Sequence, residues 1–298
     1  MNEKIKIVVT DSGLGGISVL AELENKLRSN MISQNVELIY VNAYPGEGYG
    51  YNNMESEDRK IEVFNDFLES VQKKFNPNLI LIACNTLSVI YNKTEFSKTS
   101  LITVIGIIEI GVSLVQNKIS SDEDIILLLG TETTISSNAH KNALISKGIS
   151  ETQIIMQACK NLETLIQKNA EGNETESLIK KYLSIALSKL ELNDSKIICG
   201  LFCTHYGYSK SLFEKNLLSY SSNIKIVNPN DEMANRVFKI FNTAGIKKQN
   251  VTVTVYSRCK IENEDIKSIG SLIKTKSDAV FSSLNNYQIK KDLFTIFN

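Results

Sequence analysis

Short apolar runs rich in β-branched residues alternate along this 298-residue chain with longer amphipathic stretches, and this alternation restricts the fold strongly. Most of the runs are nearly continuously apolar, which is typical of strands covered on both faces. In 17–27, Leu20, Leu23 and Leu27 recur at the three- and four-residue spacing of a helix face. Strand–helix–strand alternation predicts an α/β fold with largely parallel sheets and right-handed crossovers.

The expected elements follow this pattern along the chain. Strands are predicted over 4–10, 36–42, 79–83, 104–107, 124–130, 154–157, 196–202, 224–227 and 251–256. Helices are predicted over 17–27, 56–73, 161–169, 175–189 and 232–242. From about Thr275 the chain is polar and mixed and ends in an apolar patch at 293–297, so we expect an appended helix that packs on the body.

Composition excludes several classes of partner. Basic and acidic residues number 33 each, so the net charge is zero and neither nucleic acid nor an anionic membrane is expected as the main partner. No apolar stretch approaches the roughly 20 residues needed to span a bilayer. The first residues do not resemble a signal peptide, since their apolar run is short and stops at Asp11. Five scattered cysteines without a Cys-x-x-Cys pair predict free thiols in a reducing cytoplasm.

Two of the predicted strands end alike. The strand 79–83 runs into Cys84-Asn85-Thr86, and the strand 196–202 runs into Cys203-Thr204-His205, 119 positions later. Either cysteine alone would more often be a small buried hydrophobe. Both stand at the carboxyl end of a strand, where open α/β sheets bind ligands, so we interpret them as candidate reactive thiols from two similar domains. Cys199, Cys159 and Cys259 lack such polar neighbours and are interpreted as structural.

The first strand ends in Asp11-Ser12-Gly13-Leu14-Gly15-Gly16, which fits neither a Walker loop nor the dinucleotide glycine spacing. It places an acid and a hydroxyl at a strand tip, with glycines that allow backbone NH groups to approach an anion. The alternative is a plain strand-to-helix turn that Asp11 caps. Of the two histidines, His205 lies beside a candidate thiol, whereas His140 is interpreted as structural. No metal is expected, because the His, Cys, Asp and Glu residues show no zinc-type spacing.

Taken together, these segments resemble the glutamate racemase family within the aspartate/glutamate racemase superfamily. The resemblance runs in family order from about residue 4 to 260 and rests on Asp11-Ser12-Gly13-Leu14-Gly15-Gly16, Tyr49-Gly50, Cys84-Asn85-Thr86, Val104–Glu109, Gly130-Thr131-Glu132-Thr133-Thr134 and Cys203-Thr204-His205-Tyr206. It implies two similar α/β domains related by pseudo-twofold symmetry, with the active site between them. The first domain would comprise 1–103 and 210–298, and the inserted second domain would comprise 104–209.

The resemblance also implies a chemistry. It implies cofactor-independent racemisation of L-glutamate to D-glutamate for peptidoglycan, in which Cys84 and Cys203 exchange the roles of thiolate base and thiol acid. Asp11 would assist Cys84, and His205 would assist Cys203. Substrate amino and carboxylate groups would be held by Asn85, Thr86, Thr134 and Thr204. The side-chain carboxylate would be bound by Ser12, Tyr49 and the Gly50 amide. No pyridoxal or other cofactor is expected; glutamate is the expected ligand and a homodimer the expected assembly.

The chain departs from the family pattern at positions that bear on the choice of amino acid. Glu47 and Gly48 precede Tyr49 where proline is usual, Gln167 stands where many members carry Glu, Gly207 stands in place of Pro, and Asn228 in place of Asp. Two alternatives therefore stay open. One is a racemase of another amino acid, for example aspartate, and the other is a non-catalytic, racemase-like protein that binds an amino acid.

Overall fold

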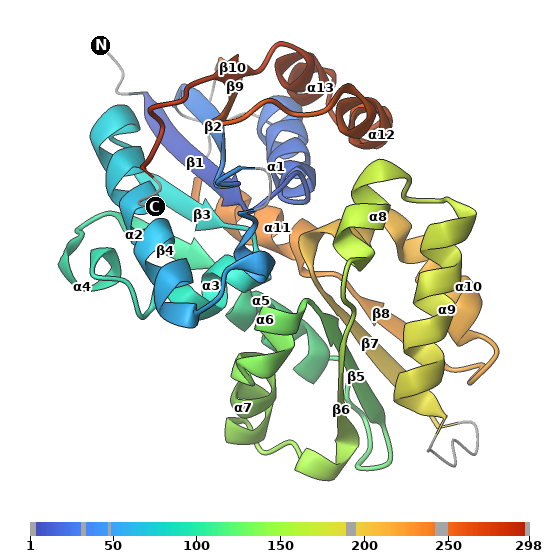
Figure 1. Ribbon diagram of the computed structural model, residues 1–298. Coiled ribbons are helices and arrows are strands. Elements are labelled where there is room, and N and C mark those ends of the chain that lie inside the picture. The colour runs from blue at the N-terminus through green and yellow to red at the C-terminus, as the bar shows by residue number, and fades with distance from the viewer. Residues whose placement is uncertain (1–3, 31–33, 47–48, 189–194, 242–249, 296–298) are drawn as a thin grey trace. The chain divides into compact units, whose positions relative to one another are not determined.

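A computed structural model describes residues 4–30, 34–46, 49–188, 195–241 and 250–295. The chain divides into two compact units, each with its own parallel β-sheet (Figure 1). The first unit combines Met1–Ile107 with Asn230–Asn298, and the second is Ile108–Pro229. The predicted α/β class with two parallel-sheet domains is confirmed.

The first unit contains a six-stranded sheet in the order β10-β9-β2-β1-β3-β4, with all pairs parallel. Its strands are β1 (Ile5–Asp11), β2 (Val36–Asn42), β3 (Leu79–Ile82), β4 (Thr103–Gly106), β9 (Val251–Ser257) and β10 (Gln288–Ile289). Within this sheet Asp11 pairs with Asn42, and Thr10 pairs with Ile82. Parallel register therefore brings the carboxyl ends of β1, β2 and β3 to one edge.

Helices cover both faces of this sheet. They are α1 (Ile17–Ser29), η1 (Tyr51–Asn53), α2 (Glu57–Phe75), α3 (Asn85–Tyr91), α4 (Phe96–Thr99), α11 (Pro229–Phe241), α12 (Asn263–Lys274) and α13 (Asp278–Asn285). The apolar stripe of α2, which includes Phe64, Phe67 and Val71, packs on Val8 and Ile80 of the sheet. Figure 1 shows α12 and α13 beside α1, which they contact.

The C-terminal stretch is integrated into the first unit. Its helix α13 begins at Asp278 because the Ser277 hydroxyl accepts a hydrogen bond from the Val280 amide. The following segment contributes Leu293 and Phe294 to the core under α2. Packing of the stretch from about Thr275 on the body agrees with the sequence expectation, although 296–297 of the expected apolar patch lie outside the described residues.

The second unit contains a four-stranded parallel sheet in the order β6-β5-β7-β8. Its strands are β5 (Ile125–Gly130), β6 (Ile154–Ala158), β7 (Ile197–Phe202) and β8 (Ile224–Val227). Gly130 pairs with Phe202, the last residue of β7, so these two central strands end level with one another. Thr131 and Cys203 therefore leave the same edge of the sheet.

Helices also cover both faces of the second sheet. They are α5 (Ile108–Gln116), α6 (Glu132–Ser136), α7 (Ala139–Ser146), η2 (Glu151–Gln153), α8 (Leu162–Lys168), α9 (Asn173–Leu187), η3 (Thr204–Ser209) and α10 (Lys210–Leu217). Val112 and Val115 of α5 and Leu144 of α7 pack on Ile126 and Ile198. Figure 1 shows α8, α9 and α10 grouped on the other side of this sheet.

The unit boundaries differ from those expected from the sequence. The chain divides after Ile107 and after Pro229, whereas breaks after residues 103 and 209 were expected. The first break falls later because β4 pairs with β3 and so completes the first sheet. The second falls about one helix and one strand later, because α10 packs on β8 and β8 pairs with β7. The expected helix ends at 189 and 242 lie outside the described residues.

In the described part of the chain, no helix is both long enough and apolar enough to cross a lipid bilayer.

Candidate functional site

The carboxyl end of β1 places Asp11 at the edge of the first sheet. Its side chain is buried, and its Oδ1 accepts a hydrogen bond of 2.9 Å from the Gly13 amide. Its carbonyl accepts one from the Ala43 amide just beyond β2. The turn after β1 is thus closed on the aspartate itself, whereas α1 begins after Gly16 without a side-chain cap.

Gly16, at the start of α1, allows the helix to approach this carboxylate. A Cβ atom at Gly16 would lie 2.8 Å from the Cβ of Asp11 and 3.1 Å from the Cβ of Ala83. Real carbon atoms do not approach so closely, so any larger residue would displace Asp11 or the end of β3. The glycine-rich segment therefore serves close packing between the end of β1 and the amino end of α1.

Cys84 follows β3 and stands immediately before α3. Its carbonyl accepts a hydrogen bond from the Ser88 amide and so takes part in the first turn of α3. Cys84 is 5% exposed, and its Sγ lies 3.2 Å from the Ser12 hydroxyl. Burial and the nearby Asp11 carboxylate raise the pKa of the Cys84 thiol to about 12, against the opposing effect of the Ser12 hydrogen bond. In this structure the group is therefore a neutral thiol at pH 7.

The other predicted residues of the first unit lie around the same sheet edge or on the segment after β2. Asn85 and Thr86 are buried in the first turn of α3. Tyr49 is 54% exposed, and Gly50 is half-buried just before η1. Glu47 and Gly48, the departures before them, lie outside the described residues.

Tyr51, which the sequence analysis did not single out, is the aromatic residue of this segment that enters the core. It is 2% exposed and packs in the same apolar cluster as Cys84, with its ring edge-on to Phe64. Burial and the proximity of Cys84 raise the pKa of its phenol. A tyrosine two positions after Tyr49 carried no spacing that would have linked it to a cysteine over 30 residues later.

In the second unit, Cys203 follows β7 as Cys84 follows β3. It is 6% exposed and precedes η3, and the Tyr206 amide donates to its carbonyl. Thr204 is buried in η3. On the neighbouring strand end, Thr131 caps α6 through the Thr134 amide and donates a 3.0 Å hydrogen bond to the Thr134 hydroxyl. The predicted residues of this unit thus lie beyond the carboxyl ends of the adjacent strands β5 and β7.

His205 joins the Cys203 thiol to α8. Its Nδ1 lies 3.9 Å from the Cys203 Sγ, and its Nε2 lies 2.9 Å from Oε1 of Gln167. The imidazole is buried, and burial lowers the pKa of His205 to about 4. The sequence marked Gln167 only as a departure from the family, because no periodicity pairs positions 38 residues apart on different elements.

Two other departures contact each other. A Cβ atom at Gly207 would lie 2.6 Å from the Asn228 Nδ2, so Asn228 occupies the space that a side chain at 207 would need. Both flank the structure that carries His205, since Gly207 belongs to η3 and Asn228 follows β8. The two changes are therefore one local packing arrangement.

Cys199, Cys159 and the second histidine are buried in structural surroundings. Cys199 is buried in the middle of β7, and burial raises the pKa of its thiol. The Cys159 carbonyl accepts a hydrogen bond from the buried Tyr206 hydroxyl. His140 stacks on Phe202 with 4.1 Å between ring centroids, and burial lowers its pKa to about 3.

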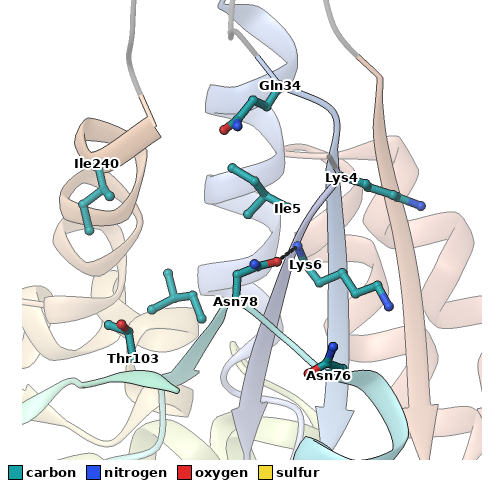
Figure 2. Close-up of a pocket in the computed structure, with 9 residues that line it drawn as sticks. Lys4, Ile5, Lys6, Gln34, Asn76, Asn78, Thr103 and Ile240 are labelled. Atoms are coloured by element: carbon teal, nitrogen blue, oxygen red, sulfur yellow. Dashed lines mark hydrogen bonds between the residues drawn. The ribbon is translucent and has the colours of Figure 1, made fainter. Parts of the chain in front are cut away.

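A cavity of about 540 Å³ lies at the opposite edge of the first sheet, where β1, β3 and β4 begin (Figure 2). The Asn78 side chain accepts from the Lys6 amide at 2.8 Å. Both lysines in its wall have partners, since the Lys4 ammonium pairs with Glu37 and the Lys6 ammonium donates to the Phe75 carbonyl. The cavity wall contains none of the candidate residues.

Among the described residues, no group of three or more His, Cys, Asp and Glu side chains is arranged to hold a metal ion.

Sequence comparison finds clear relatives, although no family model matches the chain. A glutamate racemase of Fusobacterium nucleatum is 31% identical over 238 residues, which cover 78% of this chain and 80% of that protein. A glutamate racemase of Helicobacter pylori is 32% identical over 207 residues, which cover 68% of this chain and 72% of that protein.

Structure comparison agrees at the level of the fold. The crystal structure of glutamate racemase from Francisella tularensis, in complex with D-glutamate, matches with a TM-score of 0.71 at 22% identity. The match covers 96% of this chain and 97% of the other.

Proposed function

Since this chain belongs to the glutamate racemase family and is therefore an amino-acid racemase, we propose that it interconverts L- and D-glutamate through Cys84 and Cys203. Racemisation removes the weakly acidic α-proton from one face of the substrate and returns a proton to the other. Two groups on opposite faces can do this without either group moving. The observation that carries the proposal is the matched placement of two buried thiols, each within two residues of the end of a parallel strand and each beside a polar partner.

In the proposed reaction one cysteine is a thiolate and the other a thiol. The thiolate sulfur accepts the α-proton, the second thiol gives its proton to the opposite face of the carbanion, and the two sulfurs end with exchanged protonation states. The direction of reaction decides which cysteine begins as the base. A free thiol has a pKa of about 8.5, so modest changes in its surroundings suffice to move it between the two roles at neutral pH.

Asp11 gives Cys84 a substrate-dependent acidity. In this structure burial and the carboxylate raise the pKa of the thiol to about 12, which favours the acid role. We propose that the α-ammonium of glutamate binds beside Asp11. Its positive charge offsets the repulsion between carboxylate and thiolate, and so lowers the Cys84 pKa towards the range where it can act as a base.

The remaining site residues are proposed to hold the substrate. Asn85, Thr86, Thr134, Thr204 and His205 would contact the amino and carboxylate groups at the reacting carbon. Ser12, Tyr49 and the Gly50 amide would contact the side-chain carboxylate. Backbone NH groups are suited to this task, because they are neutral donors whose direction the fold fixes.

Exchange of the substrate α-proton with solvent tests the proposal. In heavy water we expect the protein to incorporate deuterium at Cα of both glutamate enantiomers while it racemises them. Cys84→Ala and Cys203→Ala should each lower racemisation by at least about 1,000-fold, since one acid/base group is lost. One of these two single-substitution variants should still exchange the α-proton of one glutamate enantiomer with solvent, without converting that enantiomer into the other.

Cys199→Ala is the matched control, because it removes a buried thiol from the strand that leads into Cys203. It should racemise glutamate at a rate close to that of the unaltered protein. Exchange with aspartate or another amino acid but not with glutamate would contradict the proposed substrate. Undiminished racemisation in both active-site variants would contradict the two-thiol mechanism.

We further propose that the D-glutamate made here serves peptidoglycan synthesis in the cytoplasm and that the active protein is a homodimer. The five cysteines are free thiols, which supports a reducing compartment. Expression in a bacterial strain that requires D-glutamate should restore growth without the supplement, and the Cys84→Ala variant should not. Light scattering during size exclusion should give twice the mass of one chain.

A further inference from the structure

His205 contacts Gln167 through the side of its imidazole that faces away from Cys203. Oε1 of Gln167, on α8, lies 2.9 Å from Nε2, while Nδ1 faces the Cys203 sulfur at 3.9 Å. His205 is 6% exposed, so its ring is largely withdrawn from water and depends on protein groups for its hydrogen bonds. The aromatic ring of Tyr208 lies edge-on to the His205 imidazole, with 6.4 Å between the ring centroids.

We infer that Gln167 is a positioning residue that places the proton of neutral His205 on Nε2 and leaves the Nδ1 lone pair facing the Cys203 thiol. The inference rests on the proposed function, because it concerns how one of the two thiols is assisted. It adds to that function Gln167, a residue on α8, and a defined protonation state for His205.

The hydrogen-bonding chemistry of the two side chains supports this assignment. A carboxamide oxygen can only accept, so the nitrogen that faces it must carry the proton. A neutral imidazole has a single N–H, and therefore the other nitrogen is an acceptor. Burial holds the imidazole neutral at pH 7 by lowering its pKa to about 4. The Cys203 S–H is then the group able to donate towards Nδ1.

This tautomer allows His205 to activate Cys203 without rearrangement. When Cys203 must act as a base, its S–H bond breaks and an Nδ1–H bond forms, which gives a thiolate beside an imidazolium. The negative charge of the adjacent thiolate favours the protonated ring and so opposes the effect of burial on the pKa of His205. Nε2 keeps its proton and its hydrogen bond to Gln167 throughout. With the opposite tautomer Nδ1 would already carry a proton, and the imidazole could not accept the one from the thiol.

Nitrogen NMR of the resting protein tests the inference directly, because the chain has only two histidines. In protein labelled with ¹⁵N-histidine at pH 7, long-range couplings from the ring carbon protons distinguish the protonated nitrogen from the bare one. His205→Ala identifies which set of signals belongs to position 205. We expect the Nε2–H tautomer at His205.

Gln167→Met removes the acceptor at similar length, so the His205 signals should shift towards a mixture of tautomers. The kcat for glutamate should fall about tenfold, with KM within about twofold of its original value. Gln167→Glu keeps an acceptor oxygen at this position and should retain the Nε2 proton. Gln157→Met is the control, since Gln157 lies on β6 and its amide donates to the neighbouring Ala158 carbonyl. It should leave the His205 signals unchanged.

An Nδ1–H tautomer in the unaltered protein overturns the inference, as does an unchanged Nε2–H tautomer in a folded Gln167→Met variant. The spectrum needs no turnover, so the result is separate from the proposed function. An Nδ1–H tautomer in a protein that racemises glutamate overturns the Gln167 inference alone. An Nε2–H tautomer in a protein that never exchanges the glutamate α-proton overturns the proposed function alone.

Discussion

His140 and His205 are both buried as neutral imidazoles in the second unit, one against Phe202 and the other between Cys203 and Gln167. Burial lowers the pKa of His140 to about 3 and that of His205 to about 4, from an ordinary value of 6.5. Because both folded-state values are depressed, the unfolded chain binds protons that the folded chain does not accept. Both residues therefore couple the stability of the fold to acidity.

We predict that the free energy of unfolding falls as the pH drops below about 6.5, where the unfolded imidazoles begin to protonate. At pH 5 the loss should be about 2 kcal/mol for each histidine, relative to pH 7.5. His140→Phe, which keeps an aromatic ring against Phe202, should remove roughly half of this loss. Chemical denaturation at the two pH values measures both effects. An identical loss in the variant would show that His140 titrates normally in the folded protein.

Individual site residues could be predicted where they follow a strand, and not where they depend on a distant element. Asp11, Cys84 and Cys203 were identified because apolar runs in the sequence show where strands end, and parallel sheets bring those ends together, whereas Thr134 came only from the family resemblance. Gln167 contacts His205 from another helix, so its role became visible only in the structure. The pairing of Gly207 with Asn228 was hidden for the same reason, because two separate departures form one contact.

At the scale of elements, strands proved easier to locate than the joins between them. The nine predicted strands are present, and each of their ends lies within one residue of the predicted position, because buried parallel strands are continuous apolar runs bounded by polar residues. The two-residue β10 has exposed side chains and so leaves no apolar run. The unit boundary was placed too early at 209, because the sequence of β8 does not indicate which of the two sheets the strand belongs to, and β8 pairs with β7 of the second sheet.

The start of α13 depends on a buried polar contact with α1. The Ser277 hydroxyl accepts from the Val280 amide and donates to the Glu24 carboxylate at 2.6 Å, and both side chains are 1% exposed. Ser277→Ala should lower the free energy of unfolding by about 2–3 kcal/mol, because it removes a helix cap and leaves a buried carboxylate oxygen without its donor. Chemical denaturation measures this loss.

Ser271→Ala provides the comparison, since this hydroxyl is exposed on the neighbouring helix α12 and bonds only within it. Its effect should stay within about 0.5 kcal/mol, as is usual for surface substitutions. If the two alanine variants were equally stable, Ser277 would have no role in joining α13 to α1.

At the scale of the whole molecule, the two units differ in how the chain supplies them. The second unit is one continuous stretch, whereas the first is assembled from two stretches that the second separates. The join within the first sheet is the pairing of β2 with β9 along seven residues, from Val36 with Val251 to Asn42 with Ser257. The amino-terminal stretch alone therefore lacks β9, the strand that pairs with β2 on the side away from β1.

We predict that residues 108–229 fold when produced alone, because they contain every strand of the second sheet and the helices on both of its faces. Circular dichroism should show a cooperative thermal transition for this fragment. Residues 1–107 alone should show none, since β2 is left with an unpaired edge and α1 loses α12 and α13. Cooperative unfolding of 1–107 with none in 108–229 would reverse this assignment.

The contact between Ser12 and Cys84 depends on the register in which Thr10 pairs with Ile82. Ser12 lies two positions beyond Thr10, and Cys84 lies two positions beyond Ile82. Loss of a single residue from the middle of either strand would pull one partner back by about 3.3 Å and turn its side chain to the opposite face. Length changes in the connections at the other edge of the sheet would have no such effect. Among natural variants of this chain, insertions and deletions should therefore gather where the strands begin and be missing within β1 and β3.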